Sequence, residues 1–310
     1  MYNTDKLAKI KEKEGKTMIK RIFSDMDGTL LTSQGQVSSE TAKAVRRSNI
    51  PFTLVSARAP MEMKETMDQL GLIGPQVAFN GGLIFSYEKG KIRPLHTAII
   101  PKQTAHHLLS LIRQEFPKLS LSYYDLNHWY CDKIDAGIRY EHELTKQTPH
   151  FIQNQKTFLA ACENIFKLML ITFDEEEMLA VEKRLRTLSL EEITIQRSGR
   201  YYLEITSKKA KKSKGIAYIF KKERLKKEET IAFGDGHNDL PMFDMVGYPI
   251  VMENALNEVK EKAYKITKSN DEDGVRYALK HYVKPLQQIT KSRKERFLKK
   301  GASLLLPFIS

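Results

Sequence analysis

The sequence is poor in cysteine and in long apolar runs, and these two shortages exclude several kinds of protein. Its 310 residues include two cysteines, Cys131 and Cys162. They cannot build the disulfide framework of a small secreted protein, and they do not form a CxxC metal pair. The most apolar stretch, ASLLLPFIS at 302–310, is too short to span a bilayer. With no apolar signal sequence near Met1, we expect a cytoplasmic protein without a membrane partner.

Positive charge is in excess, but it is concentrated in a few segments. The net charge is +13, with lysine-rich stretches at 1–17, 208–229 and 285–310. Few aromatic residues lie between these basic residues, unlike the interleaved pattern of single-strand binders. We therefore expect solvated tails and a solvated helix face, and no nucleic-acid partner.

What the sequence does contain is typical of a folded protein with two domains. It is 41% hydrophobic, 29% charged and 9% aromatic, which is ordinary for a globular chain. Its length is about twice that of a usual single domain. Nothing in these numbers sets the oligomeric state.

Strands and helices alternate in the first part of the chain. The pattern predicts strands at 19–25, 51–58 and 76–82, with helices at 38–48 and 60–71. The same rhythm returns with a helix near 214–220 and strands at 230–235 and 249–252. Strands that alternate with helices form parallel sheets with right-handed crossovers. We predict an α/β fold with a doubly wound, Rossmann-like parallel sheet.

Between these two stretches the rhythm changes to strands at 165–173 and 192–206 around an acidic helix near 175–188. This predicts an inserted α+β domain, whose tyrosines and tryptophan we expect mostly to pack its own core. The predicted parts are a core domain at 18–83 and 207–284, an inserted domain at 84–206, and extensions at 1–17 and 285–310. The first extension is expected to be disordered, with Met18 as the true start. The second is basic and then apolar, and it is either docked or loose.

Two carboxylates stand where the first predicted strand ends. Asp25 and Asp27 lie in the segment DMDGTL, at the end of a strand where doubly wound sheets place their sites. An ionised aspartate beside an apolar strand needs a cation or hydrogen bonds. Gly28 allows the sharp turn that follows. A simple acid pair at a strand-to-turn junction explains this motif alone about equally well.

A second apolar strand also ends in acids. The segment GDGHNDL places Asp235 at the strand end and Asp239 four residues later. Carboxylates from two strand ends of one sheet offer the hard oxygen ligands that Mg²⁺ prefers. Helix capping by Asn238 or Asp239 is the alternative. Capping does not explain why the first strand carries the same signature.

Two weaker signals lie between these motifs. Ser56, two residues before Arg58, stands at a strand end that precedes a helix, where a hydroxyl and a helix N-terminus together bind phosphate. Lys214 precedes an apolar helical pattern and is suited to neutralise phosphate charge. A helix-capping serine and a solvated lysine are the ordinary alternatives.

Together these motifs resemble those of the haloacid dehalogenase (HAD) superfamily phosphatases, in particular the Cof-type subfamily, which has a large cap domain inserted after the third strand. DMDGTLL resembles the first motif of that family and GDGHNDLPMF the fourth. The NGG of Asn80–Gly82 and the SNDEDGV of 269–275 are similar to Cof-type segments. The resemblance covers residues 18–282.

The resemblance implies a Mg²⁺-dependent phosphoric monoester hydrolase that acts on small phosphorylated metabolites through an aspartyl-phosphate. Asp25 would be the nucleophile and Asp27 the general acid and base. The implied metal ligands are Asp25, the main-chain carbonyl of Asp27, Asp235, and Asp239 through water. The implied phosphate-binding residues are Ser56, Lys214 and Asn238, with Arg58 and Asn80 as candidate substrate contacts. Sugar phosphates, FMN-like flavin phosphates and pyridoxal phosphate are the candidate substrates.

Two positions depart from the family pattern. The second motif reads Ser-Ala-Arg where many relatives have Thr-Gly-Arg, so the hydroxyl is kept while Arg58 follows an alanine instead of a glycine. Lys214 has close competitors, and it is preferred because Lys-Gly directly before the apolar helix fits the family spacing. The competitors are Lys208, Lys209, Lys211 and Lys212.

Two other functions stay open at this point. A phosphomutase or a dedicated sugar-phosphate phosphatase shares the fold, but no residue pattern indicates the retained intermediate that a mutase needs. A basic nucleic-acid-binding or regulatory protein on a phosphatase fold is a remote alternative. It predicts a degraded site, whereas the motif residues are all present.

Overall fold

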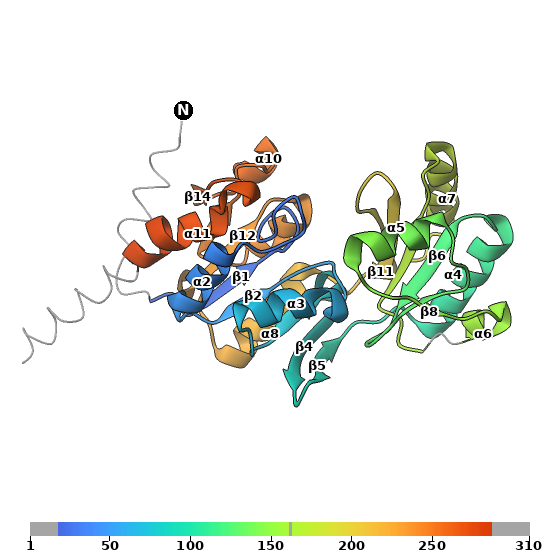
Figure 1. Ribbon diagram of the computed structural model, residues 1–310, viewed down its shortest axis with the longest axis horizontal. Coiled ribbons are helices and arrows are strands. Elements are labelled where there is room, and N and C mark those ends of the chain that lie inside the picture. Colours follow the sequence, from blue (N-terminus) through green and yellow to red (C-terminus); the bar gives the residue numbers. More distant parts are fainter. Residues whose placement is uncertain (1–17, 161–162, 287–310) are drawn as a thin grey trace, which may run out of the picture. The chain divides into compact units, whose positions relative to one another are not determined.

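A computed structural model describes residues 18–160 and 163–286 (Figure 1). By the density of their contacts, these residues fall into two compact units. The first unit comprises residues 18–52 and 220–286, and the second unit comprises residues 53–219.

Some predictions concern residues that the structure does not describe. The extension at 1–17, the cysteine at 162 and residues 287–310 lie outside the described residues. The predicted core domain (18–83 and 207–284) and inserted domain (84–206) stay a prediction. None of the helices in the described part of the chain has the length and apolar character that crossing a membrane requires.

The first unit is built on a five-stranded sheet with short helices. Its strands are β1 (Arg21–Ser24), β12 (Thr230–Gly234), β13 (Tyr248–Val251), β14 (Lys265–Ile266) and β2 (Phe52–Leu54), where the chain passes into the second unit. Its α-helices are α2 (Ser39–Ser48), α9 (Leu240–Phe243), α10 (Asn257–Lys260), α11 (Gly274–Ala278) and the end of α8 (Lys212–Glu223), which crosses the same boundary. The other helical segments are the 3-10 turns η2 (Lys227–Glu229), η3 (His237–Asp239) and η4 (Asn270–Glu272), and the π-helical segment η5 (Leu279–Val283).

The strands of this sheet run in the order β14-β13-β12-β1-β2. β1 pairs in parallel with β12, which follows it by about 200 residues in the sequence, with Arg21 opposite Thr230 and Ser24 opposite Phe233 (Figure 1). β12 pairs with β13 and β13 with β14, also in parallel. Every residue of β1 and β12 is buried, as expected for a parallel sheet covered on both faces. The predicted α/β fold is confirmed, and the carboxyl ends of these strands share one edge.

The second unit contains two further sheets. Its strands are β3 (Gln76–Ala78), β4 (Leu83–Glu88), β5 (Lys91–Thr97), β6 (Ser120–Tyr124), β7 (Trp129–Cys131), β8 (His150–Phe151), β9 (Lys167–Ile171), β10 (Ile193–Arg197) and β11 (Tyr202–Ser207). Its helices are α3 (Pro60–Leu70), η1 (Phe79–Gly81), α4 (Lys102–Glu115), α5 (Ala136–Thr145), α6 (Gln155–Ala160), α7 (Glu175–Thr187) and the start of α8. The larger sheet has the order β10-β11-β9-β6-β7-β8 and is antiparallel except for the β7–β8 pair.

Helices cover both faces of this larger sheet. Alternate residues of its central strands, such as Leu121 and Leu168, join one apolar core with α4, α6 and α7. On the other face, α5 lies so close to the sheet that a side-chain carbon on Gly137 would overlap Ser120. The fully buried Tyr123 belongs to the apolar core, as expected for the aromatic residues of this region.

The third predicted strand differs from the expectation in its length and pairing. It ends at Ala78 and pairs antiparallel with β4, so Asn80–Gly82 falls in a turn outside the strand. Its parallel pairing is limited to one isolated bridge, between Val77 of this strand and Val55. The apolar pattern predicted the start of the strand correctly. It could not show that the strand ends at Ala78 and that a tight turn begins at Phe79.

A buried group of charges lies on the face opposite the apolar core. Lys167 is 4% exposed, and its Nζ is 3.2 Å from Glu204 Oε1 and 4.7 Å from the ring centre of Tyr124. Glu141 on α5 is 5% exposed and accepts a hydrogen bond from Tyr202 Oη at 2.7 Å. Burial raises the pKa of Glu141. Burial would lower the pKa of Lys167, but nearby carboxylates outweigh this effect, and its pKa lies above the usual value.

We expect Lys167→Met to destabilise the fold by about 3 kcal/mol, because the change leaves buried carboxylates without their cation. Lys167→Met/Glu204→Gln should recover part of this loss. Because the pKa of Lys167 is raised in the folded state, the charged lysine contributes fully to the free energy of unfolding below pH 10.5. This contribution is lost only as the pH rises through the folded-state pKa. Urea unfolding measures these free energies.

The matched control is Lys102→Met, because Lys102 forms an exposed ion pair with Glu163. That change should cost less than about 1 kcal/mol. Equal losses for the two lysine variants would contradict a special role for the buried pair.

Candidate active site

Three carboxylates come together at the carboxyl edge of the parallel sheet. One oxygen each from Asp25, Asp235 and Asp239 lies within 4.8 Å of the others. Asp25 follows β1 and is 6% exposed, while Asp239 on η3 is fully buried. The Asp25 main-chain N–H donates to the carbonyl of Phe233 at 3.0 Å, which aligns the two strand ends. The structure thus brings together the three carboxylates predicted for the metal site, and the fourth predicted ligand, the main-chain carbonyl of Asp27, stays a prediction.

The turn after β1 lies directly against Asp235. Gly28 has a φ of +72°, and a side-chain carbon at this position would overlap the Asp235 carboxylate. Thr29 Oγ1 donates a hydrogen bond to Asp235 Oδ1 at 2.5 Å. Glycine is therefore required twice, for the left-handed backbone and for the close approach. Thr29 is not among the residues predicted from the sequence, and only its place directly after the DxDG segment could have indicated it.

Asp239 also shapes the loop that carries Asp235. Its Oδ2 accepts hydrogen bonds from the main-chain N–H groups of Asp235 and Gly236, each at 3.0 Å. A side-chain carbon on Gly234 would lie 2.6 Å from the Asp239 carboxyl carbon. Asp239 therefore accepts main-chain hydrogen bonds at this helical turn, as the capping alternative predicts, and it is also a member of the carboxylate cluster.

The other predicted residues of the first unit lie near this cluster in sequence. Asp27 is exposed, one residue before Gly28 in the same turn. Asn238 is half-buried on η3, between His237 and Asp239. Their predicted roles stay predictions.

In the second unit, Ser56 is part of a tightly bonded loop. Its side chain is fully buried, and its Oγ accepts a hydrogen bond from the Arg58 N–H at 3.1 Å. Its main-chain N–H donates to Val77 at 2.9 Å, and its carbonyl accepts from the Asn80 N–H at 2.8 Å. The Phe79 N–H donates to the Arg58 carbonyl at 3.0 Å. The second predicted motif and the Asn-Gly-Gly turn are thus neighbours.

That turn has an unusual backbone. Phe79, Asn80 and Gly81 have φ values of +51°, +54° and +98°. Left-handed conformations cost about 1–3 kcal/mol in non-glycine residues and are often found at functional sites. Among the residues that the structure describes, Asn80 Oδ1 is buried and accepts no hydrogen bond. A buried acceptor without a donor is unfavourable, so this atom is a candidate contact for a bound group.

The same turn packs against the start of α8. A side-chain carbon on Gly81 would overlap the main-chain carbonyl of Lys211. That carbonyl also accepts a hydrogen bond from the Lys214 N–H at 2.8 Å. Lys212 is buried, whereas Lys214 is exposed and therefore accessible to a ligand. The second unit thus connects Ser56, Asn80 and the first turn of α8 through its own contacts.

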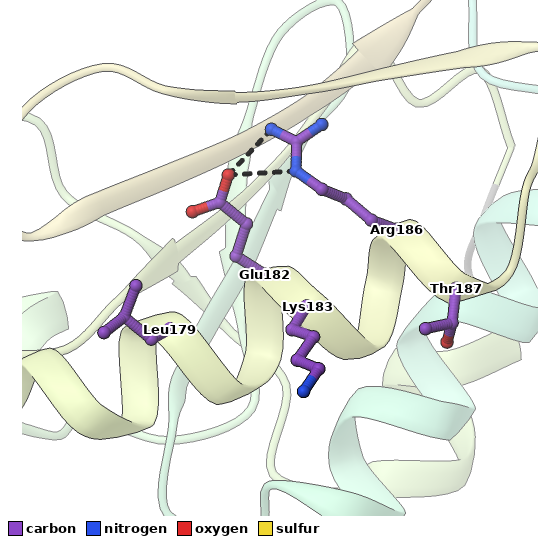
Figure 2. Close-up of a pocket in the computed structure, with 5 residues that line it drawn as sticks. All are labelled: Leu179, Glu182, Lys183, Arg186 and Thr187. Atoms are coloured by element: carbon purple, nitrogen blue, oxygen red, sulfur yellow. Dashed lines mark hydrogen bonds and ion pairs between the residues drawn. The ribbon is translucent and has the colours of Figure 1, made fainter.

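A hollow of about 450 Å³ in the second unit is not a candidate active site (Figure 2). All five residues that line it come from α7, and an ion pair between Glu182 and Arg186 crosses it at 2.7 Å. Leu179 gives it an apolar edge (Figure 2). It contains none of the predicted site residues, and one helix face alone does not supply convergent polar groups.

Comparison with known proteins agrees with this geometry. Residues 22–279 match the haloacid dehalogenase-like hydrolase family. A putative phosphatase from Haemophilus influenzae is 32% identical, over 83% of this chain and 96% of its own length. A 5-amino-6-(5-phospho-D-ribitylamino)uracil phosphatase from Bacillus subtilis is 29% identical, over 84% and 96% respectively.

Among solved structures, a haloacid dehalogenase-like hydrolase from Bacteroides thetaiotaomicron superposes with a TM-score of 0.77. It is 27% identical, and the match covers 84% of this chain and 98% of that one. The resemblance predicted from the motifs is confirmed. The chain belongs to the haloacid dehalogenase-like hydrolase family, and it is a phosphatase of that family.

Proposed function

We propose that this protein is a Mg²⁺-dependent phosphatase of small phosphorylated metabolites that works through an aspartyl-phosphate. The observation that carries the proposal is the cluster of Asp25, Asp235 and Asp239, each of which has one oxygen within 4.8 Å of the others. Three carboxylates this close repel one another unless a cation or protons intervene.

The donor set is suited to Mg²⁺ rather than to a softer metal. It consists of carboxylate oxygens, with neither histidine nor cysteine in the cluster. Asp25 and Asp235 would hold the ion together with the main-chain carbonyl of Asp27, and Asp239 would act through water. The ion supplies positive charge that offsets the charge of the phosphoryl oxygens and of Asp25.

In the first half-reaction Asp25 is the nucleophile. A carboxylate oxygen of Asp25 forms a bond to phosphorus while the bond from phosphorus to the leaving oxygen breaks. Asp27, protonated at this stage, donates its proton to the leaving alcohol. The side chain of Asp27 is exposed in the turn before Gly28, so a substrate can reach it.

In the second half-reaction water replaces the alcohol. Asp27, now a carboxylate, accepts a proton from the water whose oxygen bonds to phosphorus. The bond from phosphorus to the Asp25 oxygen breaks, which releases inorganic phosphate and restores both aspartates.

The proposal gives phosphate binding to Ser56, Lys214 and Asn238. The exposed Lys214 would neutralise phosphoryl charge, and Ser56 would donate its hydroxyl hydrogen. Asn80 and Arg58 would contact the substrate. The buried Oδ1 of Asn80 supports this role, because it would accept a hydrogen bond from a hydroxyl or amine of the leaving group.

The substrate class is a small phosphorylated metabolite of the cytoplasm, an environment that agrees with the low cysteine content. Sugar phosphates, flavin phosphates and pyridoxal phosphate are candidates. The Bacillus subtilis relative is named for a phosphorylated ribitylamino-uracil, which supports a substrate with a polyol chain. A phosphomutase would require retention of the aspartyl-phosphate, and no observation favours it.

We expect Asp25→Asn to lower phosphate release by at least about 10³-fold while the fold is kept, because the amide has the size of the carboxylate but lacks its nucleophilic oxygen. The assay measures inorganic phosphate from a panel of phosphorylated metabolites, with and without Mg²⁺. Asp68→Asn on the exposed face of α3 is the control and should keep full activity. Substantial turnover by pure Asp25→Asn protein would refute the covalent mechanism.

We also expect Mg²⁺ to raise the melting temperature of the wild type. A ligand at 100 times its Kd stabilises the folded state by about 2.7 kcal/mol. Asp235→Asn should lose this shift because it removes one carboxylate of the cluster, and EDTA should reverse the shift in the wild type. Asp244→Asn, at an exposed position of the first unit, should keep it. An equal Mg²⁺ shift in both variants would place the ion elsewhere.

A further inference from the structure

The turn that carries Asp27 and Gly28 is held by two loops that follow β13 and β14 of the same sheet. Asn254 lies just after β13, and Asn270 begins η4 just after β14. Both loops leave the carboxyl ends of strands that pair in parallel with one another and, through β12, with β1. They therefore start at the same sheet edge as Asp25 and Asp235.

Hydrogen bonds connect these loops to the main chain of the turn. Asn254 Nδ2 donates to the Gly28 carbonyl at 2.8 Å, and Asn254 Oδ1 accepts from the Asn270 N–H at 3.1 Å. Asn270 Nδ2 donates to the Leu31 carbonyl at 2.9 Å. Asp271 Oδ1 accepts from the main-chain N–H of residue 33 at 2.7 Å. The turn is thus tied at three points between residues 28 and 33.

The chemistry of these contacts requires an amide at position 254. A carbonyl can only accept and a main-chain N–H can only donate, so the side chain must offer one donor and one acceptor. This requirement also fixes the orientation of the Asn254 amide. An aspartate would have no hydrogen for Gly28 and would place its negative charge against a carbonyl oxygen.

The segment behind Asn270 is itself firmly held. The Gly274 N–H donates to the Ser269 carbonyl at 3.0 Å, and Thr267 Oγ1 donates to the Gly274 carbonyl at 2.6 Å. Asp273 has a φ of +56° and accepts a hydrogen bond from Thr41 Oγ1 on α2 at 2.9 Å. The SNDEDGV segment therefore connects α2, the turn and β14, and it gives the two asparagines a fixed support.

We propose that Asn254 and Asn270 are positioning residues that hold the turn after β1 in place, so that Asp27 keeps its orientation beside the carboxylate cluster. The Gly28 carbonyl is one peptide unit beyond the carbonyl of Asp27, so a bond to the first restrains the second. A displacement of about 1 Å at a reacting group can cost about 10²-fold in rate. The restraint on the turn stands on its own, while its effect on turnover rests on the proposed function.

The test compares Asn254→Asp and Asn254→Ala with the control Asn257→Asp. Asn257 is an exposed residue that begins α10, three positions after Asn254 in the sequence. Hydrogen exchange followed by mass spectrometry reports on residues 26–33, where the N–H groups of Thr29, Leu30 and Leu31 donate to the Met26 carbonyl. Steady-state hydrolysis of p-nitrophenyl phosphate gives kcat and KM separately. Asn254→Ala adds no charge, so it separates loss of the restraint from an electrostatic effect.

We expect both Asn254 variants to exchange faster in residues 26–33 and to lose at least about tenfold in kcat, with KM within about twofold of the wild type. Asn257→Asp should match the wild type in all three measurements. Unchanged exchange in residues 26–33, or faster exchange with an unchanged kcat, would overturn the proposal. A wild type that releases no phosphate would count against the proposed function, and the exchange measurement would still decide whether Asn254 holds the turn.

Discussion

Three carboxylates, each with one oxygen within 4.8 Å of the others, set the constraint on which the first unit depends. Their mutual repulsion opposes the folded state, so the protein must fix each of them by other means. Asp25 is fixed by its place at the end of a fully buried strand, and Asp235 by the hydroxyl of Thr29. Asp239 is fixed by two main-chain N–H groups. The cluster exists because strand ends and local hydrogen bonds outweigh the repulsion.

This constraint explains why small residues surround the cluster. Gly28 and Gly234 each lie where a side-chain carbon would collide with a carboxylate of the cluster. The two glycines bring the turn after β1 and the loop after β12 close enough for their acids to face one another. A larger residue at either place would move an acid outward and lower the charge density that makes the site suitable for a divalent cation.

The part of the site that could be predicted from the sequence is the part that depends on strand ends. Because β1 and β12 are buried, their sequences are apolar runs that can be recognised as strands. Parallel pairing then brings Asp25 and Asp235 to the same edge of the sheet. Contacts between distant loops were not predictable in this way. Asn254 donates to a carbonyl 226 positions earlier, and nothing in its local sequence indicates that partner. The buried Lys167 was missed for the same reason, because its carboxylate partners come from other strands and helices.

The two kinds of residue also differ in what a substitution would change. In the proposed mechanism, a residue at a strand end, such as Asp25, supplies an atom that the reaction uses. A residue whose role follows from a distant contact, such as Asn254, supplies only a restraint, and its loss leaves every reacting group present. Asn80 differs from both, because it lies in a left-handed turn and has a buried oxygen that accepts no hydrogen bond within the described residues. Main-chain hydrogen bonds and the stacking of Phe79 on Phe166 stabilise the turn itself. They leave this oxygen without a donor, so we expect a group that arrives from outside to supply one.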